Sequence, residues 1–129
     1  MSTVLALLAI SVGAAMGALL RYALGLWLNG ALPALPMGTL AANLLAAYIV
    51  GVAIAFLATA PELSPNWRLF IITGLAGGLS TFSTFSAELL TLLRDGQIAW
   101  SAGMVALHLG GSVAMTALGM LSTSFVQHS

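Results

Sequence analysis

The sequence TGLAGGLSTFSTFSAELL, residues 73–90, decides how this chain folds. It belongs to an apolar segment long enough to cross a membrane, yet glycines and hydroxyl side chains fill its middle. Each glycine inside a helix costs up to about 1 kcal/mol relative to alanine. The cluster of Gly74, Gly77 and Gly78 therefore predicts a helix break near residues 74–80. A continuous helix that uses these glycines as a packing face is the alternative.

Backbone groups freed by such a break must be satisfied inside the protein or in a water-filled cavity, because lipid offers no hydrogen bonds. The end of the first half-helix presents free carbonyl groups, which suit a cation. The start of the second half presents free N–H groups, which suit an anion. Ser80 or Thr81 can cap the second half. A break here therefore predicts ion-binding groups within the membrane.

The composition identifies a membrane protein. Of the 129 residues, 60% are hydrophobic and only 5% are charged, whereas about a quarter of the residues of a soluble domain are charged. The chain has no cysteine, which excludes disulfide bonds and thiolate metal sites. We therefore expect an integral membrane protein whose function lies inside the bilayer.

Four apolar runs alternate with short polar segments, and each is close to the roughly 20 residues that a membrane-spanning helix needs. The first run has neither a basic region before it nor a clear cleavage site, so we interpret it as a retained helix. The prediction is one all-α transmembrane domain over residues 1–129. Its four helices are expected at about 4–28, 39–59, 69–93 (the broken helix) and 98–125.

The few charged residues give the chain no clear orientation. Arg68 lies in the one loop on the N-terminal side, whereas Arg21 and Arg94 lie near the opposite side. Membrane insertion depends on an asymmetry of basic residues, and almost none exists here. The simplest prediction is dual topology, which makes an antiparallel homodimer available. A single orientation fixed by another signal is the alternative.

The second half of the broken helix is polar over much of its circumference. Phe82 and Phe85 are three residues apart and share one face. Thr81, Thr84 and Glu88 form an adjacent stripe. Such a surface cannot face lipid, so it lines a wet space or packs against polar partners. A core contact between the two phenyl rings is the plainer alternative.

Other predicted helices carry matching polar side chains. They are Thr39 and Asn43 on the second helix, and Ser101, His108, Ser112 and Thr116 along one stripe of the fourth. On the first helix, Arg21 follows the small-residue pair Gly13 and Gly17, which is typical of close helix packing. Arg21 either extends to the membrane surface or supplies a fixed positive charge that attracts anions.

This set of side chains is rich in neutral hydrogen-bond donors and poor in charge. Hydroxyl and amide groups can replace the hydration of a small ion without creating a deep trap. The positive edge of a phenyl ring can face an anion. The pattern therefore favours a pathway for a small, strongly hydrated ion, although hydroxyls bonded within their own helix would explain the Ser and Thr residues equally well.

Three other classes of protein stay open. A small multidrug-type, proton-coupled antiporter would need a membrane-embedded glutamate, for which Glu88 is the candidate. An intramembrane hydrolase could combine a serine with His108 and Glu88, but no nucleophile motif is present, so we predict that the chain is not an enzyme. A structural assembly subunit would leave the stripe of hydroxyl and phenyl groups unused.

The central motif GGLSTFSTFSAE, residues 77–88, resembles the signature of the Fluc (CrcB) fluoride channel family. The resemblance extends to GALLRY, PMGTLAANLLA and LHLGGSVAMTALG in the first, second and fourth helices. It implies an antiparallel, dual-topology homodimer with two pores, which exports toxic fluoride down its electrochemical gradient across the inner (plasma) membrane. The implied partners are fluoride, a second copy of the chain and the lipid bilayer, with no nucleic acid.

The resemblance also implies roles for particular residues. Phe82 and Phe85 would present ring edges to fluoride, and Asn43 would be the asparagine of a vestibule. Backbone carbonyls of Gly77 and Ser80 from both subunits would hold a structural sodium ion at the dimer centre. Many relatives have threonine in place of Ser80, a change that leaves the carbonyl ligand unaltered. The remaining implied pathway residues are Ser83, Thr84, Ser112 and Thr116, and the residue pattern adds Glu88, His108, Thr39 and Arg21 as further candidates.

Overall fold

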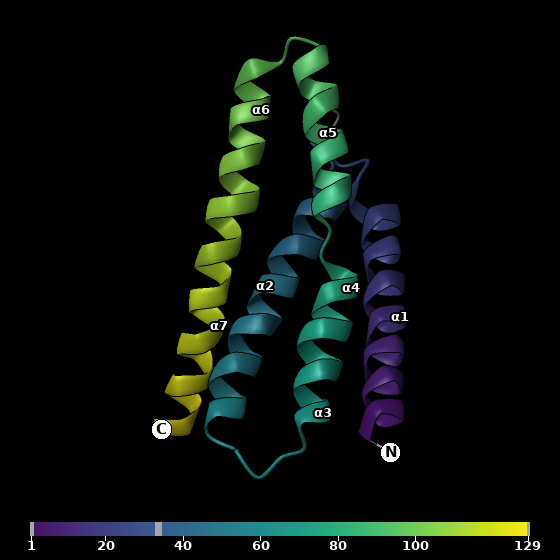
Figure 1. Ribbon diagram of the computed structural model, residues 1–129. Helices are drawn as coiled ribbons and strands as arrows, with labels where there is room; N and C mark the ends of the chain where they lie inside the picture. Colours follow the sequence, from purple (N-terminus) through teal and green to yellow (C-terminus); the bar gives the residue numbers. More distant parts are fainter. Residues whose placement is uncertain (1, 33–34, 129) are drawn as a thin grey trace.

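The computed structural model describes residues 2–32 and 35–128, which form helices joined by short loops (Figure 1). The start of α1 and the end of α7 lie at one end of the molecule, and the hairpin between α5 and α6 extends beyond α1 and α2 at the other. Segments η1 and η2 are π-helical stretches inside longer helices. The elements in chain order are α1 (Ser2–Leu28), α2 (Met37–Ala58), α3 (Pro65–Arg68), η1 (Leu69–Ala76), α4 (Gly77–Leu79), α5 (Phe82–Arg94), α6 (Ile98–Val105), η2 (Ala106–Gly110) and α7 (Gly111–His128).

Within residues 2–32 and 35–128, four helices are long and apolar enough to cross a membrane, which confirms the predicted number of spans. The third begins before the predicted residue 69, because Pro65 occupies its first turn and the Ser64 hydroxyl accepts a hydrogen bond from Asn66 N–H at 3.2 Å. The loop between the first two spans contains residues 33–34, which lie outside the described part of the chain. The spans are Thr3–Leu28, Met37–Ala58, Pro65–Arg94 and Ile98–Gln127.

The third span bends at Ser80 and Thr81, at the end of the interval predicted from the glycines. Ser80 has φ −78° and ψ 156°, and Thr81 has φ −152° and ψ 121°, so both are extended. Gly74 lies in η1, and Gly77 and Gly78 lie in α4, so all three are helical. The prediction of a bent third helix is confirmed. The glycines do not themselves form the break, because glycine lowers helix stability without forcing the chain to leave the helix.

The glycines instead allow α1 to approach the third span very closely. A Cβ atom on Gly17 would overlap the main chain of Leu75 and Leu79, and one on Gly78 would overlap the main chain of Ala14. Small residues allow such close backbone approach between membrane helices, where lipid provides no hydrophobic drive for association. The packing face that the alternative assigned to the glycines is correct for Gly74 and Gly78, but the continuous helix that it assumed is wrong, because the span breaks at Ser80 and Thr81.

A second close contact joins α2 to α7. A Cβ atom on Gly51 would overlap the Thr116 carbonyl, and one on Gly119 would overlap the Tyr48 carbonyl. The Thr116 hydroxyl also donates to the Ala47 carbonyl at 3.2 Å across this contact. The two helix pairs meet along a narrow core in which the buried residues are Ala42, Ala46, Ala76 and Leu79.

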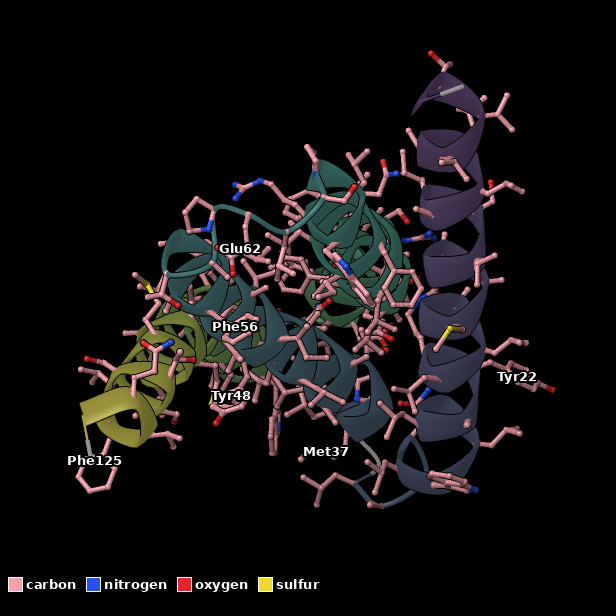
Figure 2. The ribbon with its side chains drawn as sticks, turned by 90° about the horizontal axis from the view of Figure 1, so that it is seen from below. Tyr22, Met37, Tyr48, Phe56, Glu62 and Phe125 are labelled. Atoms are coloured by element: carbon pink, nitrogen blue, oxygen red, sulfur yellow. The ribbon has the colours of Figure 1, made fainter. Side chains whose placement is uncertain are left out.

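Large apolar side chains cover much of the outer surface. Tyr22 is 67% exposed and Phe125 is 78% exposed, and both point away from the helices (Figure 2). An exposed apolar surface of this extent is unusual for a soluble monomer and suits a lipid environment. Together with the four spans, it makes the chain a multi-pass integral membrane protein.

We expect Gly17→Ala to destabilise the fold by about 1–3 kcal/mol, because the added methyl group meets main-chain atoms that cannot rotate away. The free energy of unfolding in mixed detergent micelles, followed by circular dichroism, measures this loss. Gly103→Ala is the control, since nothing lies within 4 Å of its added Cβ atom. Equal stability of the two variants would contradict the close approach of α1 to the third span.

Candidate functional site

The bend in the third span is held by one side chain from the second. Asn43, in α2, accepts a hydrogen bond from the Thr81 N–H through Oδ1 at 2.7 Å, and its Nδ2 donates to the Thr81 carbonyl at 3.2 Å. In a continuous helix the Thr81 N–H would donate to the carbonyl of Gly77. Asn43 therefore replaces the missing helical partner, which satisfies the backbone inside the protein as the membrane requires.

Thr81 also starts the second half of the broken helix. Its hydroxyl accepts a hydrogen bond from Thr84 N–H at 3.1 Å, as expected for an N-cap threonine. The same hydroxyl lies 3.4 Å from the Ser83 hydroxyl. Of the two capping residues considered from the sequence, Thr81 is the one that caps α5.

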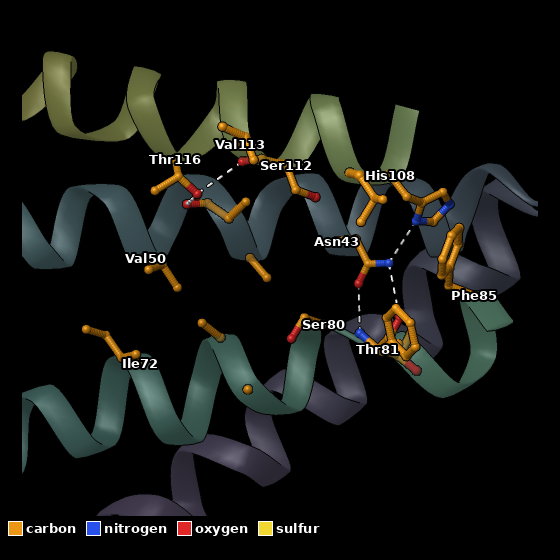
Figure 3. A pocket seen from close by; sticks show the side chains of 16 residues that line it. Asn43, Val50, Ile72, Ser80, Thr81, Phe85, His108, Ser112, Val113 and Thr116 are labelled. Atoms are coloured by element: carbon orange, nitrogen blue, oxygen red, sulfur yellow. Dashed lines mark hydrogen bonds between the residues drawn. The ribbon is translucent and has the colours of Figure 1, made fainter. Parts of the chain in front are cut away.

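His108 extends this arrangement to the fourth span. It lies in the π-helical segment η2, is only 4% exposed, and places Nδ1 2.9 Å from Asn43 Nδ2. Its ring packs on Phe85 with centroids 4.5 Å apart. Asn43 and His108 point toward one another beside Phe85 (Figure 3). Three spans therefore converge on one amide side chain.

A cavity of about 450 Å³ opens beside this amide. Among the residues that line it, none carries an aspartate, glutamate, lysine or arginine side chain. The single hydrogen of the Thr116 hydroxyl lies within reach of two carbonyls, those of Ala47 at 3.2 Å and Ser112 at 3.0 Å. The lining polar residues from the sequence prediction are Asn43, Ser80, Thr81, His108, Ser112 and Thr116, together with Phe82 and Phe85.

A second cavity, of about 330 Å³, lies toward α1. Thr39 and Thr84 line it, and Thr81 lines both cavities. Arg21 also lines it, with Nε donating to the Gly78 carbonyl at 3.2 Å. Of the two roles considered for Arg21, this bond favours a fixed charge within the protein over a side chain that extends to the membrane surface.

Glu88 lies next to the second cavity but does not line it. The Thr39 hydroxyl donates to Glu88 Oε2 at 2.7 Å, while the buried Oε1 has no hydrogen-bond partner within residues 2–32 and 35–128. Ser83 lines neither cavity. The structure thus groups most of the predicted site residues around the bend. Glu88 is linked to this group through Thr39, and Ser83 is exposed beside it.

The two phenylalanines of the central motif have different environments in the single chain. Their ring centroids are 5.6 Å apart, so the rings contact each other, but this is not the core contact of the plainer alternative because one ring lies on the surface. Phe85 is 5% exposed, whereas Phe82 is 72% exposed although it lines the first cavity. Phe82 therefore belongs both to the outer surface of the single chain and to the lining of the first cavity.

A cation site built from side chains is not found in the described part of the chain, where no cluster of three His, Cys, Asp or Glu residues exists. Gly77 and Ser80 both line the first cavity beside the bend. The Thr81 amide, the helical partner of the Gly77 carbonyl, is engaged by Asn43. These carbonyls therefore fit the ligand type that the sequence prediction assigned to sodium.

Sequence reasoning missed the partners that position these residues. It placed Asn43 on a polar face but did not pair it with Thr81 or His108, because residues 38 and 65 positions apart meet only in the folded chain. It also missed Asn29, whose Oδ1 accepts hydrogen bonds from Gly38 and Thr39 N–H at 2.7 and 3.3 Å. In the sequence, the only signal for this role of Asn29 was its place directly after the first predicted helix, residues 4–28.

The geometry first defines a class: a small multi-pass membrane protein whose third helix is interrupted beside a cavity that carries uncharged polar side chains, as in channels and transporters with discontinuous helices. The family model described as CrcB-like protein, Camphor Resistance (CrcB), matches residues 8–120. The chain belongs to this family, which confirms the resemblance inferred from the central motif.

Several relatives are similar along nearly their whole length. A protein of Xanthomonas oryzae pv. oryzae named "Fluoride-specific ion channel FluC" is 61% identical over 100% of this chain and 96% of its own length. Proteins with the same name from Pseudomonas paraeruginosa and Paraburkholderia xenovorans are 58% and 52% identical over 93% of this chain and over 94% and 95% of their own lengths. These relatives are named as ion channels and not as enzymes, in agreement with the prediction that this chain is not an enzyme.

We expect Asn43→Leu to destabilise the protein by about 1–3 kcal/mol, because it leaves the Thr81 N–H buried beside an apolar side chain of similar size. Chemical unfolding in detergent micelles measures the loss. Thr116→Val is the control, since its hydroxyl donates only to carbonyls and its removal leaves no N–H unpaired. If Asn43→Leu were as stable as the control, Asn43 would not be what satisfies the bend.

Proposed function

We propose that the protein is a fluoride-selective, passive ion channel of the inner (plasma) membrane that exports fluoride down its electrochemical gradient. The observation that carries the proposal is the cavity of about 450 Å³ beside the bent helix, in which neutral hydroxyl, amide and imidazole groups and two phenyl rings lie among aliphatic side chains. The name shared by the relatives supports fluoride as the ion.

The chemistry of this cavity suits a small anion that has to leave as easily as it enters. Hydroxyl and amide groups replace part of the hydration shell, and the absence of a charged side chain among the lining residues avoids tight capture. The edges of Phe82 and Phe85 carry partial positive charge, which attracts an anion weakly. Ser112, Thr116, Ser83 and Thr84 extend the polar path to either side of the rings in this proposal.

The channel is proposed to be an antiparallel homodimer with two pores, formed by copies inserted in opposite directions. Phe82 is 72% exposed in the single chain although it belongs to the polar cavity, and a second chain would cover it. The near-absence of charge asymmetry supports insertion in both directions. A homodimer with twofold symmetry would use the same surface on both copies.

Sodium is proposed as a structural ion between the two copies, held by the carbonyls of Gly77 and Ser80. These oxygens lie at the end of the first half-helix, where the dipole favours a cation. When bound, the ion would supply a fixed positive charge that offsets part of the cost of an anion in a low-dielectric region. Ser80 N–H donates to the Ala76 carbonyl at 2.9 Å, which places Ser80 at the end of the first half-helix.

The antiporter interpretation gains no support. Glu88 does not line the cavity at the bend, and one of its oxygens is bonded to Thr39. The relatives reported above carry the name of a channel. Glu88 is therefore proposed as a neighbour of the ion path that helps to shape it through Thr39.

The proposed function is tested by anion efflux from liposomes that contain the purified protein. Fluoride and chloride gradients of equal size are compared without a proton gradient. Rapid fluoride efflux with negligible chloride efflux is expected. Absence of fluoride efflux from folded protein would refute the function, and efflux that requires a proton gradient would favour coupled transport instead.

We expect Phe82→Ile and Phe85→Ile each to reduce fluoride efflux by about tenfold or more, because isoleucine keeps an apolar side chain of similar reach but has no electropositive ring edge. Crosslinking and size-exclusion chromatography check that the variants assemble as the unmodified protein does. Leu90→Ile, an exposed apolar position on the same helix outside both cavities, is the control. Normal efflux in both phenylalanine variants would exclude the rings from the path.

The sodium proposal predicts that thorough replacement of sodium by potassium lowers both dimer stability and fluoride efflux, because potassium is larger than sodium and would not fit the same carbonyl ligands. Dimer dissociation by subunit exchange and efflux are measured in parallel. Equal rates of dimer dissociation and of fluoride efflux in sodium and in potassium would refute the structural role of sodium. The proposed channel function would not be affected.

A further inference from the structure

The amide of Asn43 is fully engaged. Its Oδ1 accepts from Thr81 N–H at 2.7 Å, and its Nδ2 donates to the Thr81 carbonyl at 3.2 Å and reaches His108 Nδ1 at 2.9 Å. An amide NH₂ group has two hydrogens, so both are used. An anion in the adjacent cavity can take a hydrogen bond from Asn43 only if one of these acceptors gives it up.

The two acceptors differ in how they hold the amide: the bond to His108 is the shorter, at 2.9 Å against 3.2 Å, but the bond to the Thr81 carbonyl is one of a pair. Thr81 holds the amide by two hydrogen bonds, and its N–H, which can only donate, fixes the oxygen of Asn43 on that side. The orientation of the amide therefore does not depend on His108. His108 Nδ1 accepts only the remaining amide hydrogen. This hydrogen bond can break while the two bonds to Thr81 keep the amide in place.

The same reasoning fixes the protonation of the imidazole ring. Because Asn43 Nδ2 can only donate, His108 Nδ1 must present a lone pair, so the ring is neutral with its hydrogen on Nε2. Nε2 is buried and has no hydrogen-bond partner among the described residues. The ring is held instead by packing on Phe85 at 4.5 Å, and it is 4% exposed.

We propose that His108 is a competing acceptor that tunes how tightly the channel holds its anion, by occupying the one Asn43 N–H that an ion in the cavity can take. The ion binds by displacing His108 Nδ1 from this hydrogen, and Nδ1 recaptures the hydrogen when the ion leaves. His108 thus weakens ion binding at Asn43 and speeds release. This role rests on the proposed channel function.

Two substitutions at position 108 separate this role from a merely structural one. His108→Phe keeps a planar ring against Phe85 but removes the acceptor. His108→Asn places a carbonyl oxygen at the branch position that Nδ1 occupies and so restores an acceptor. We expect His108→Phe to lower the half-saturating fluoride concentration and the maximal efflux rate together, each by about 2- to 10-fold, the effect of one net hydrogen bond. His108→Asn is expected to stay near the unmodified protein in both.

A damaged fold would give a different pattern. If His108→Phe lowered the maximal rate with the half-saturating concentration unchanged or raised, the competing role would be overturned. The same follows if His108→Asn behaved like His108→Phe, since the acceptor would then be irrelevant. Absence of fluoride efflux from the unmodified protein would instead refute the channel function itself, and this role with it.

A second measurement observes His108 itself and needs no substitution at position 108. In the unmodified protein, ¹⁵N-histidine NMR should report a neutral His108 with unprotonated Nδ1, and sodium fluoride should shift this resonance while sodium chloride should not. The other histidine, His128, is identified by His128→Asn. A protonated Nδ1, or an Nδ1 resonance that fluoride leaves unchanged while fluoride efflux is intact, would overturn the proposal.

Discussion

The rest of the structure depends on one constraint: a helix that stops inside a membrane has to find partners for its free backbone groups within the protein. Asn43 provides both partners for Thr81, one for the N–H and one for the carbonyl. A bend that would otherwise cost several unsatisfied polar groups is thereby stabilised by a single side chain from another helix. Because that side chain also reaches His108, the bend, the second span and the fourth span are fixed relative to one another.

Close helix packing makes this geometry accessible. Gly17 and Gly78 bring α1 against the third span on one side, and Gly51 and Gly119 bring α7 against α2 on the other. The contacts leave the helices as two tight pairs rather than an evenly spaced bundle, with polar cavities on either side of Thr81. The glycines thus determine which helices pack closely and, as a result, where the two cavities remain between the helices.

The electrostatics follow from what lines these cavities. The larger cavity has neutral donors and phenyl rings in its lining. Arg21 gives the smaller cavity a positive charge, and its Nε donates a hydrogen bond to the Gly78 carbonyl. In the proposed channel, an anion that enters through the second cavity would first meet the Arg21 guanidinium and then the weak, neutral donors of the first cavity. The guanidinium attracts the anion by long-range charge, and the weak donors allow it to move on, as conduction requires.

The sequence by itself determined the four spans, the bent third helix and most of the side chains gathered at the bend, because apolar run length and helical period are local properties. It also indicated the family, through the motif of residues 77–88. Only the tertiary structure decided that the bend falls at Ser80 and Thr81 and that Gly74 and Gly78 pack against α1. It alone paired Asn43 with both Thr81 and His108. Hydrogen bonds between residues far apart in the chain fix the place of a break, whereas glycine only makes a break less costly.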